Sequence, residues 1–320
     1  MKYVILLTGR KSFSQTFLMI YLLSISFSAN SQNNTPVQKV PSAKFSEGII
    51  YSKTTFPGHA LNETFKKLDL ENPEFLDQSN LIDALKKYQQ SINGMQEQDI
   101  KDGFFISGMM LLPVYSKMYY TSAKSVIETY ALGYRQQTLI DNTGKTGKLV
   151  LLARDKSNQG TIAFKTNEIK EVWQKYQVNA EQYSIQKTAE TAVIAGYPCK
   201  KIVYTFGGTT RGLPVSNYVI NMEPHKVTVW YSDDLPATIN LIHPHYFDLD
   251  KAVLKYEVEF DKNHKNKMLV EITKLEQQKI EEEKFDVKEL VPVIEHKQGS
   301  YEGGTIIMQV MMNAISLLTK

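Results

Sequence analysis

The sequence contains a single cysteine, Cys199, so no disulfide can form within the chain. It has no G-x-S-x-G, no H-E-x-x-H and no S-x-x-K followed by its partner motifs, so no familiar hydrolase or metalloprotease site is indicated. Beyond its first residues it also has no apolar run near the roughly 20 residues of a membrane-spanning helix. Stability must therefore come from a hydrophobic core, which a 42% hydrophobic content can supply.

The net charge is also small, with 37 Lys and Arg against 34 Asp and Glu. Three basic residues, Lys2, Arg10 and Lys11, lie in the first 31 residues, which contain no acidic residue. The rest of the chain is therefore neutral, with 34 residues of each sign. A neutral chain offers no electrostatic argument for a nucleic-acid partner.

The N-terminal 31 residues show the order of an export signal. Their basic residues precede an apolar segment at 17–25, about half the length of a membrane span, and small and polar residues follow up to Ser31. This order predicts a signal peptide over 1–31, cleaved near Ser31, and a periplasmic or outer-envelope location. A buried N-terminal helix is the alternative. We expect a flexible, polar leader at 32–44 and a single domain at 45–320.

Most of the chain beyond Tyr115 alternates between apolar and polar residues, as antiparallel strands with one wet face do. In one such stretch Tyr256, Val258 and Phe260 alternate with Glu257 and Glu259. Short polar linkers such as 142–144 and 156–160 are typical of hairpin connections. The pattern therefore predicts an antiparallel sheet that is dry on one face.

Two regions have a helical pattern instead. Leu81, Leu85, Tyr88 and Ile92 recur at helical spacing within a segment at 56–112, which we interpret as a helical insertion between the first two strands. The tail at 304–320 is apolar around most of its circumference and predicts a buried C-terminal helix. Because the dry face needs cover, the predicted fold class is α+β, a strongly curved antiparallel sheet with helices covering its concave face.

Three short motifs have both a functional and a structural interpretation. Gly144-Lys145-Thr146 resembles the end of a phosphate loop, but Leu139 stands where that loop needs glycine, which favours a hairpin turn. His243-Pro244-His245, with Asp248 and Asp250 close behind, could hold a metal, although Pro244 argues against a regular strand and favours a surface loop. Cys199 precedes two lysines that could lower its pKa, but a small apolar residue at the start of a strand is the favoured interpretation.

Two stretches carry a resemblance to a known family. The first is 134–141 (YRQQTLID), continuing to 149–152 (LVLL), and the second is 189–202 (AETAVIAGYPCKKI), followed by 227–234 (VTVWYSDD). Together they resemble exported, uncharacterised β-rich proteins with "IAGYxCKK…VWY" motifs, which are distantly similar to periplasmic lipoprotein carriers of the LolA/LolB type. That resemblance implies a half-barrel with helices against an apolar concave face. The insertion at 56–112 and His243-Pro244-His245 depart from the family pattern, and no catalytic residues carry over.

We therefore expect a non-enzymatic envelope protein that binds a lipid or other apolar ligand in the concave face of the sheet, without a cofactor or metal. Its partners would be a lipid or lipoprotein acyl chain, and an envelope protein. The alternative is a structural or interaction protein with a filled core and no ligand, and a hydrolase is the third class. The expected ligand-facing residues are Tyr204, Phe206, Tyr256, Val258, Phe260, Met308, Met311 and Met312.

The export signal makes a direct prediction. Mass analysis of the protein from an envelope fraction should show the loss of about 31 residues, because a signal peptidase removes the signal after export. An intact N-terminus on protein from that fraction would contradict the assignment.

Overall fold

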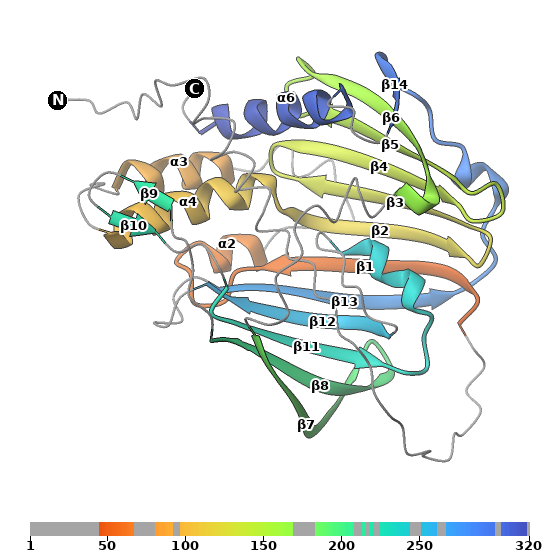
Figure 1. The fold of residues 1–320 in the computed structure, drawn as a ribbon, viewed down its shortest axis with the longest axis horizontal. Helices are drawn as coiled ribbons and strands as arrows, with labels where there is room; N and C mark the ends of the chain where they lie inside the picture. The colour runs from red at the N-terminus through yellow and green to blue at the C-terminus, as the bar shows by residue number, and fades with distance from the viewer. Residues whose placement is uncertain are drawn as a thin grey trace.

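The computed structural model describes residues 45–66, 81–91, 97–168, 183–207, 213–215, 218–220, 224–243, 251–260, 267–297 and 302–318 (Figure 1). Its α-helices are α2 (Asn62–Lys66), α3 (Leu81–Ser91), α4 (Glu97–Leu111) and α6 (Glu302–Ser316), and its short 3-10 helices are η2 (Thr166–Glu168), η4 (Ala237–Ile242) and η5 (Glu282–Phe285). The strands are β1 (Glu47–Thr55), β2 (Pro113–Thr121), β3 (Lys124–Ala131), β4 (Tyr134–Asp141), β5 (Thr146–Ala153), β6 (Gln159–Lys165), β7 (Tyr183–Ile194), β8 (Tyr197–Phe206), β9 (Leu213–Val215), β10 (Tyr218–Ile220), β11 (Lys226–Ser232), β12 (Ala252–Glu259), β13 (Lys267–Gln277) and β14 (Val293–Glu295).

One large open sheet organises the molecule. Its twelve strands follow the order β14-β6-β5-β4-β3-β2-β1-β13-β12-β11-β8-β7, and β9 and β10 form a separate two-stranded sheet. Neighbouring strands of the large sheet pair antiparallel, except that β14 pairs in parallel with β6. The predicted α+β class, a curved antiparallel sheet with helices covering its concave face, is confirmed (Figure 1).

Hairpin turns connect many neighbouring strands of the sheet. Ala195 and Gly196, between β7 and β8, both have positive φ angles, which two-residue hairpin turns of the primed type require. Between β4 and β5, the backbone N–H of Gly144 donates to a carboxylate oxygen of Asp141 at 2.7 Å. The phosphate-loop-like motif therefore lies in a hairpin turn, as its missing glycine indicated.

The concave face carries three apolar clusters under three covers. The α4 cluster joins α3 and α4 to β8, β11, β12 and β13, and includes Phe56, Phe65, Leu81, Leu85, Phe105, Ile106, Met109, Tyr204, Val227, Tyr256, Val258 and Val270. The η4 cluster includes Ile50, Met118, Ile127, Ile239, Ile242, Leu254 and Ile272. The α6 cluster includes Tyr134, Leu149, Leu151, Ile162, Phe164, Ile306, Val310 and Met311. Together the covers bury the dry side that the strands' alternation predicted.

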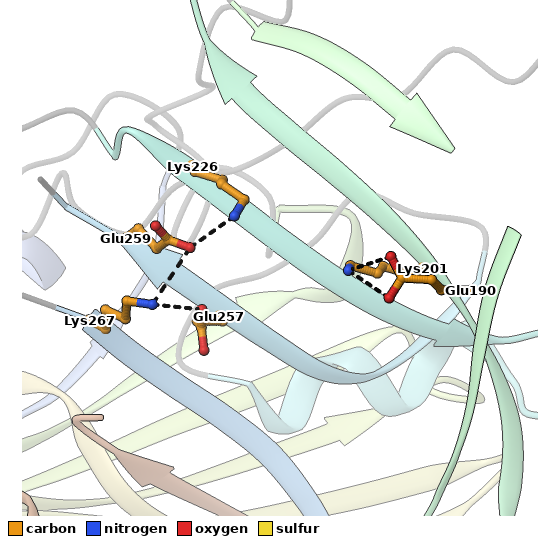
Figure 2. A network of polar contacts seen from close by, with 6 residues as sticks. All are labelled: Glu190, Lys201, Lys226, Glu257, Glu259 and Lys267. Atoms are coloured by element: carbon orange, nitrogen blue, oxygen red, sulfur yellow. Dashed lines mark hydrogen bonds and ion pairs between the residues drawn. The ribbon is translucent and has the colours of Figure 1, made fainter. Parts of the chain in front are cut away.

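The convex face is covered only in part. Beyond β13 the chain crosses the outside of β1 to β5, where Ile280, Phe285 and Val287 pack against Tyr119 and Val126. Over β8, β11, β12 and β13, the convex side instead carries paired charges (Figure 2). Lys226 lies 3.1 Å from the buried carboxylate of Glu259, and Lys267 lies 3.5 Å from Glu257. This polar side explains why the same strands need helical cover on one face only.

Helix α6 lies unusually close to the sheet because glycine and alanine meet at the contact. A Cβ atom on Gly133, in the turn between β3 and β4, would overlap both Cβ and Cα of Ala314. A Cβ on Gly160 of β6 would lie 2.7 Å from Ile306 Cδ1. One residue before Ala314, the side-chain amide of Asn313 donates to Asp155 at 3.0 Å and to Ser157 at 2.6 Å. These contacts fix the position of α6 over β4, β5 and β6.

This close contact predicts a large difference between two glycine substitutions. Gly133→Ala should lower the free energy of unfolding by about 1–3 kcal/mol, because the new methyl group meets the helix backbone and α6 must shift. Gly304→Ala, in α6 itself, should raise it by up to about 1 kcal/mol, because a Cβ there has open space and alanine favours a helix. Urea denaturation of both variants measures the difference. Equal effects would mean that α6 is not held by this contact.

Candidate ligand-binding site

The centre of the candidate site is an aromatic wall on the concave side of β8 and β12. Tyr204 and Tyr256 are fully buried there, and Val258 is nearly so. Register places Val227 of β11 opposite both Tyr204 and Val258, so the three side chains lie side by side across neighbouring strands. Phe206 and Phe260 lie at the ends of these strands and are only partly buried. Strand alternation therefore places all five predicted residues of this region on one apolar surface.

Side chains of helices α3 and α4 pack into the same apolar cluster as this wall, and the two helices lie toward one end of the sheet (Figure 1). Phe105 of α4 packs edge-on against Phe260, with ring centroids 5.7 Å apart, and also against Phe56 at 5.7 Å. Leu81 and Leu85 of α3 and Met109 of α4 are fully buried in the same cluster. In Figure 1, α3 and α4 lie side by side, with α4 next to α6. The wall and its cover thus form one continuous apolar layer.

The structure does not bring the three predicted methionines to this wall. Met308, Met311 and Met312 lie on α6 and pack into the α6 cluster, over β4 to β6. The residues just beyond that helix, Leu317 and Leu318, reach the α4 cluster. The eight expected residues therefore occupy two surfaces, and their contact with a ligand stays a prediction.

A row of buried hydroxyl groups crosses the concave face beside the apolar clusters. Ser52 of β1 is opposite Ser116 of β2, which is opposite Thr129 of β3, and all three are buried. The hydroxyls of Ser116 and Thr129 lie 3.3 Å apart, within hydrogen-bonding distance. The apolar alternation of the sequence did not point to this row. One hint was present in the sequence. Ser52 and Thr54 stand at the inward-facing positions of β1, which alternate with its outward-facing residues.

His59 was also missed by the sequence patterns. It lies in the turn between β1 and α2, is 8% exposed, and packs against the rings of Tyr88 and Phe105 with centroids 5.0 and 5.6 Å away. Burial lowers its pKa, and the nearby negative charge of Asp102 opposes that shift. Burial thus favours the uncharged form of the ring. It adds a polar group to the side of the apolar layer formed by α3 and α4.

The histidine of the possible metal site has a structural role. His243 Nε2 lies 2.7 Å from the carbonyl oxygen of Val253, and the ring packs edge-on against Tyr256. Neighbouring Asn240 accepts from the N–H of Val253 and donates to the carbonyl of Lys251. The other members of the sequence cluster, at 244–250, lie outside the described residues. Within the described ranges, no three metal-ligating side chains come together.

Cys199 behaves as the small apolar residue that its position suggested. It is buried at the start of β8, in the η4 cluster, and burial raises the pKa of its thiol to about 11. The protonated thiol is a poor nucleophile. Its lysine neighbours point elsewhere, since Lys200 pairs with Asp233 and Lys201 with Glu190 (Figure 2).

No protein-family model matches the sequence, and a search of curated proteins finds no match either. Solved structures with partial similarity include PNGF-II, at 14% identity and a TM-score of 0.37, covering 83% of this chain and 34% of that chain. The lipoprotein LppX of Mycobacterium tuberculosis matches at 9% identity and a TM-score of 0.28, covering 73% and 89%. MucB, in complex with MucA(peri), matches at 10% identity and 0.24, covering 54% and 49%.

The chain thus spans about a third of the length of PNGF-II and about half that of MucB. TM-scores this low leave the function to be argued from the residues themselves. Among the described residues, no helix is long and apolar enough to cross a membrane.

The buried histidine predicts a pH dependence of stability. Burial lowers the pKa of His243 to about 4 from an ordinary value of 6.5. Between these pH values the unfolded chain binds a proton that the folded protein does not, so the free energy of unfolding should fall as the pH falls. The contribution is roughly 3 kcal/mol at most and is fully present above pH 6.5.

Urea denaturation of wild type and His243→Gln from pH 8 to 4 tests this dependence. The variant should be less stable at pH 7 but should lose less stability on acidification. Because carboxylates titrate in both proteins, the difference between the two curves isolates the histidine. Parallel curves would show that His243 is not the group responsible.

Proposed function

We propose that this protein is a non-enzymatic binding protein of the cell envelope that holds the apolar chain of a lipid against the aromatic wall of β8 and β12. The observation that carries the proposal is that this wall shares one apolar cluster with a separate pair of helices, α3 and α4, which meet it at the end of β12 through Phe105 and Phe260. Aromatic and aliphatic side chains form both sides of the contact. Such a surface binds hydrocarbon without directional chemistry, and a long chain can replace the helical side chains in contact with it.

Two hydrogen bonds join the C-terminal end of helix α4 to the start of β4 and the turn before it. The N–H of Gly133 donates to the carbonyl of Met110 at 3.3 Å, and the hydroxyl of Tyr134 donates to the carbonyl of Leu111 at 2.8 Å. Two glycines lie further back in the helix, Gly103 and Gly108, and a Cβ on either would meet no atom within 4 Å. Close packing therefore does not account for them. Their effect is to make the helix easier to bend or unwind beyond its attachment.

The contrast between α4 and α6 decides which helix acts as the cover that opens. Glycine and alanine contacts hold α6 against the sheet, whereas α4 meets the wall through large side chains such as Phe105 and Met109. Methionine is flexible and polarisable, so Met109 and Met110 suit a contact that repacks around a ligand. We therefore assign the moving cover to α3 and α4, and a structural role to α6.

The proposed ligand and location follow from the same surface. The partner would be a lipid or the acyl chain of a lipoprotein, delivered by or passed to another envelope protein. The predicted export signal, and the neutral charge of the chain that its removal would leave, fit work in the periplasm or at the outer envelope. Cofactor chemistry has no part in this proposal.

The alternative is a structural or interaction protein whose concave face is simply filled. The close packing of α6 favours that alternative for the concave face of β4 to β6. The complete burial of Tyr204 and Tyr256 favours it for the concave face of β8 and β12. The two functions differ in what happens at α4, because only a carrier needs its cover to move.

The glycines of α4 give the discriminating prediction. Gly103→Ala with Gly108→Ala should raise the free energy of unfolding by about 1–2 kcal/mol, because alanine favours the helix and has room at both positions. In a carrier, the same change should slow the exchange of a bound fluorescent fatty acid, since the cover bends less easily. Stopped-flow displacement by unlabelled palmitate measures the exchange rate, and a thermal melt measures stability.

Gly207→Ala is the matched control, because a Cβ there also has open space but lies outside the helices. It should leave the exchange rate unchanged. Failure of the mature protein to bind any fatty acid or fatty acid ester would favour the structural alternative. Binding with an unchanged exchange rate in the double variant would show that α4 is not the moving cover.

A further inference from the structure

We propose that His59 donates a hydrogen bond to the carbonyl oxygen of an ester-linked acyl chain bound at the aromatic wall. This inference rests on the proposed function and names the ligand class: a neutral acyl ester rather than a free fatty acid. Four features of the described residues carry it: a fixed loop, a fixed tautomer, an unpaired donor and a nearby negative charge.

The loop that carries His59 is tightly bonded. The N–H of His59 donates to the carbonyl of Phe56 at 3.1 Å, and the N–H of Asn62 donates to the carbonyl of His59 at 3.0 Å. The side chain of Asn62 in turn accepts from the N–H of Phe56 at 3.1 Å. These bonds set the position of the histidine before any ligand arrives, so little ordering accompanies binding.

The same loop decides which ring nitrogen carries the proton. The backbone N–H of Leu61 donates to Nδ1 of His59 at 3.2 Å, so Nδ1 is the acceptor. A neutral imidazole has one acceptor nitrogen and one donor nitrogen, and therefore Nε2 carries the hydrogen. His59 thus presents an N–H donor.

Within the part of the chain that the structure describes, this donor has no acceptor. The Nε2 atom is buried, and no oxygen or nitrogen of the described residues lies in hydrogen-bonding position. The buried amide oxygen of Gln89, on the neighbouring helix α3, also has no hydrogen-bond partner among the described residues. The Nε2 atom of His59 and this oxygen therefore do not bond each other. A buried unpaired donor is costly, and a ligand oxygen that accepts from it removes that cost.

The donor lies next to the wall and inside the same apolar layer. The ring of Phe105 contacts both His59, with centroids 5.6 Å apart, and Phe260, at 5.7 Å. The phenyl ring of Phe105 therefore connects the polar donor with the end of β12. An acyl chain along the wall can place the oxygen at its head near Nε2 while its tail stays in hydrocarbon surroundings.

We expect the negative charge of Asp102 to favour the ester over the free acid. Asp102 lies close enough for its negative charge to oppose the lowering of the His59 pKa. The same charge repels a carboxylate, and the uncharged imidazole supplies no positive charge to offset that repulsion. An ester carbonyl accepts a hydrogen bond without bringing a charge into this site.

Matched lipids test the inference directly. Wild-type protein should bind methyl palmitate about tenfold more tightly than an alkyl ether of equal length, which lacks the carbonyl. It should also prefer the ester to palmitate at pH 8. His59→Phe keeps an aromatic ring in contact with Tyr88 and Phe105 but removes the donor. It should bind ester and ether equally, with the ether affinity of the wild type.

A measurement on the wild type covers the case in which His59→Phe does not fold. In nitrogen-15 NMR, the Nε2–H signal of His59 should shift when the ester is added and stay in place with the ether. If neither lipid binds, the proposed function fails. If both bind equally to the wild type, if palmitate binds more tightly than the ester, or if the signal responds to both lipids alike, the function stands and this inference is overturned.

Discussion

The structure depends on covering one face of an open sheet. Alternation along the strands places apolar side chains on the concave side, and an open sheet cannot bury them against itself as a closed barrel does. Three separate covers meet this need: α3 with α4, the short helix η4, and α6. Each cover packs differently, and the differences between them are the basis for assigning a function to one cover only.

The sequence predicted the pattern of the strands more accurately than it predicted where the helices sit. Tyr256 and Glu257 were placed on opposite faces by alternation, and the structure buries the first and pairs the second with Lys267. The apolar character of the last helix was equally visible. The sequence did not show which strands this helix covers, because an apolar helix carries no information about its partner beyond the sizes of its side chains.

Two features lay beyond simple periodicity. A register shift between Trp230 and Tyr231 lets Val253 join the α4 cluster while its neighbour Leu254 joins the η4 cluster, so one strand serves two covers. His59 occupies a turn, where no repeating pattern exists to mark a residue as buried. Its importance depends on a backbone N–H two residues away and on rings from two helices. These are tertiary facts that no local spacing encodes.

The position of β1 at the centre of the sheet has a consequence for the order of folding. Strands β1 to β6 are neighbours in the sheet in nearly the order in which they are made, so this half can form from local contacts. The other half attaches through β13, whose Glu276 accepts a hydrogen bond from Tyr51, 225 positions earlier in the sequence. Closing that long loop is slow, so the wall of β8 and β12 joins the rest of the sheet only after almost the whole chain has emerged. Until then, the apolar surface that the helices later cover is open to chaperones and to other chains.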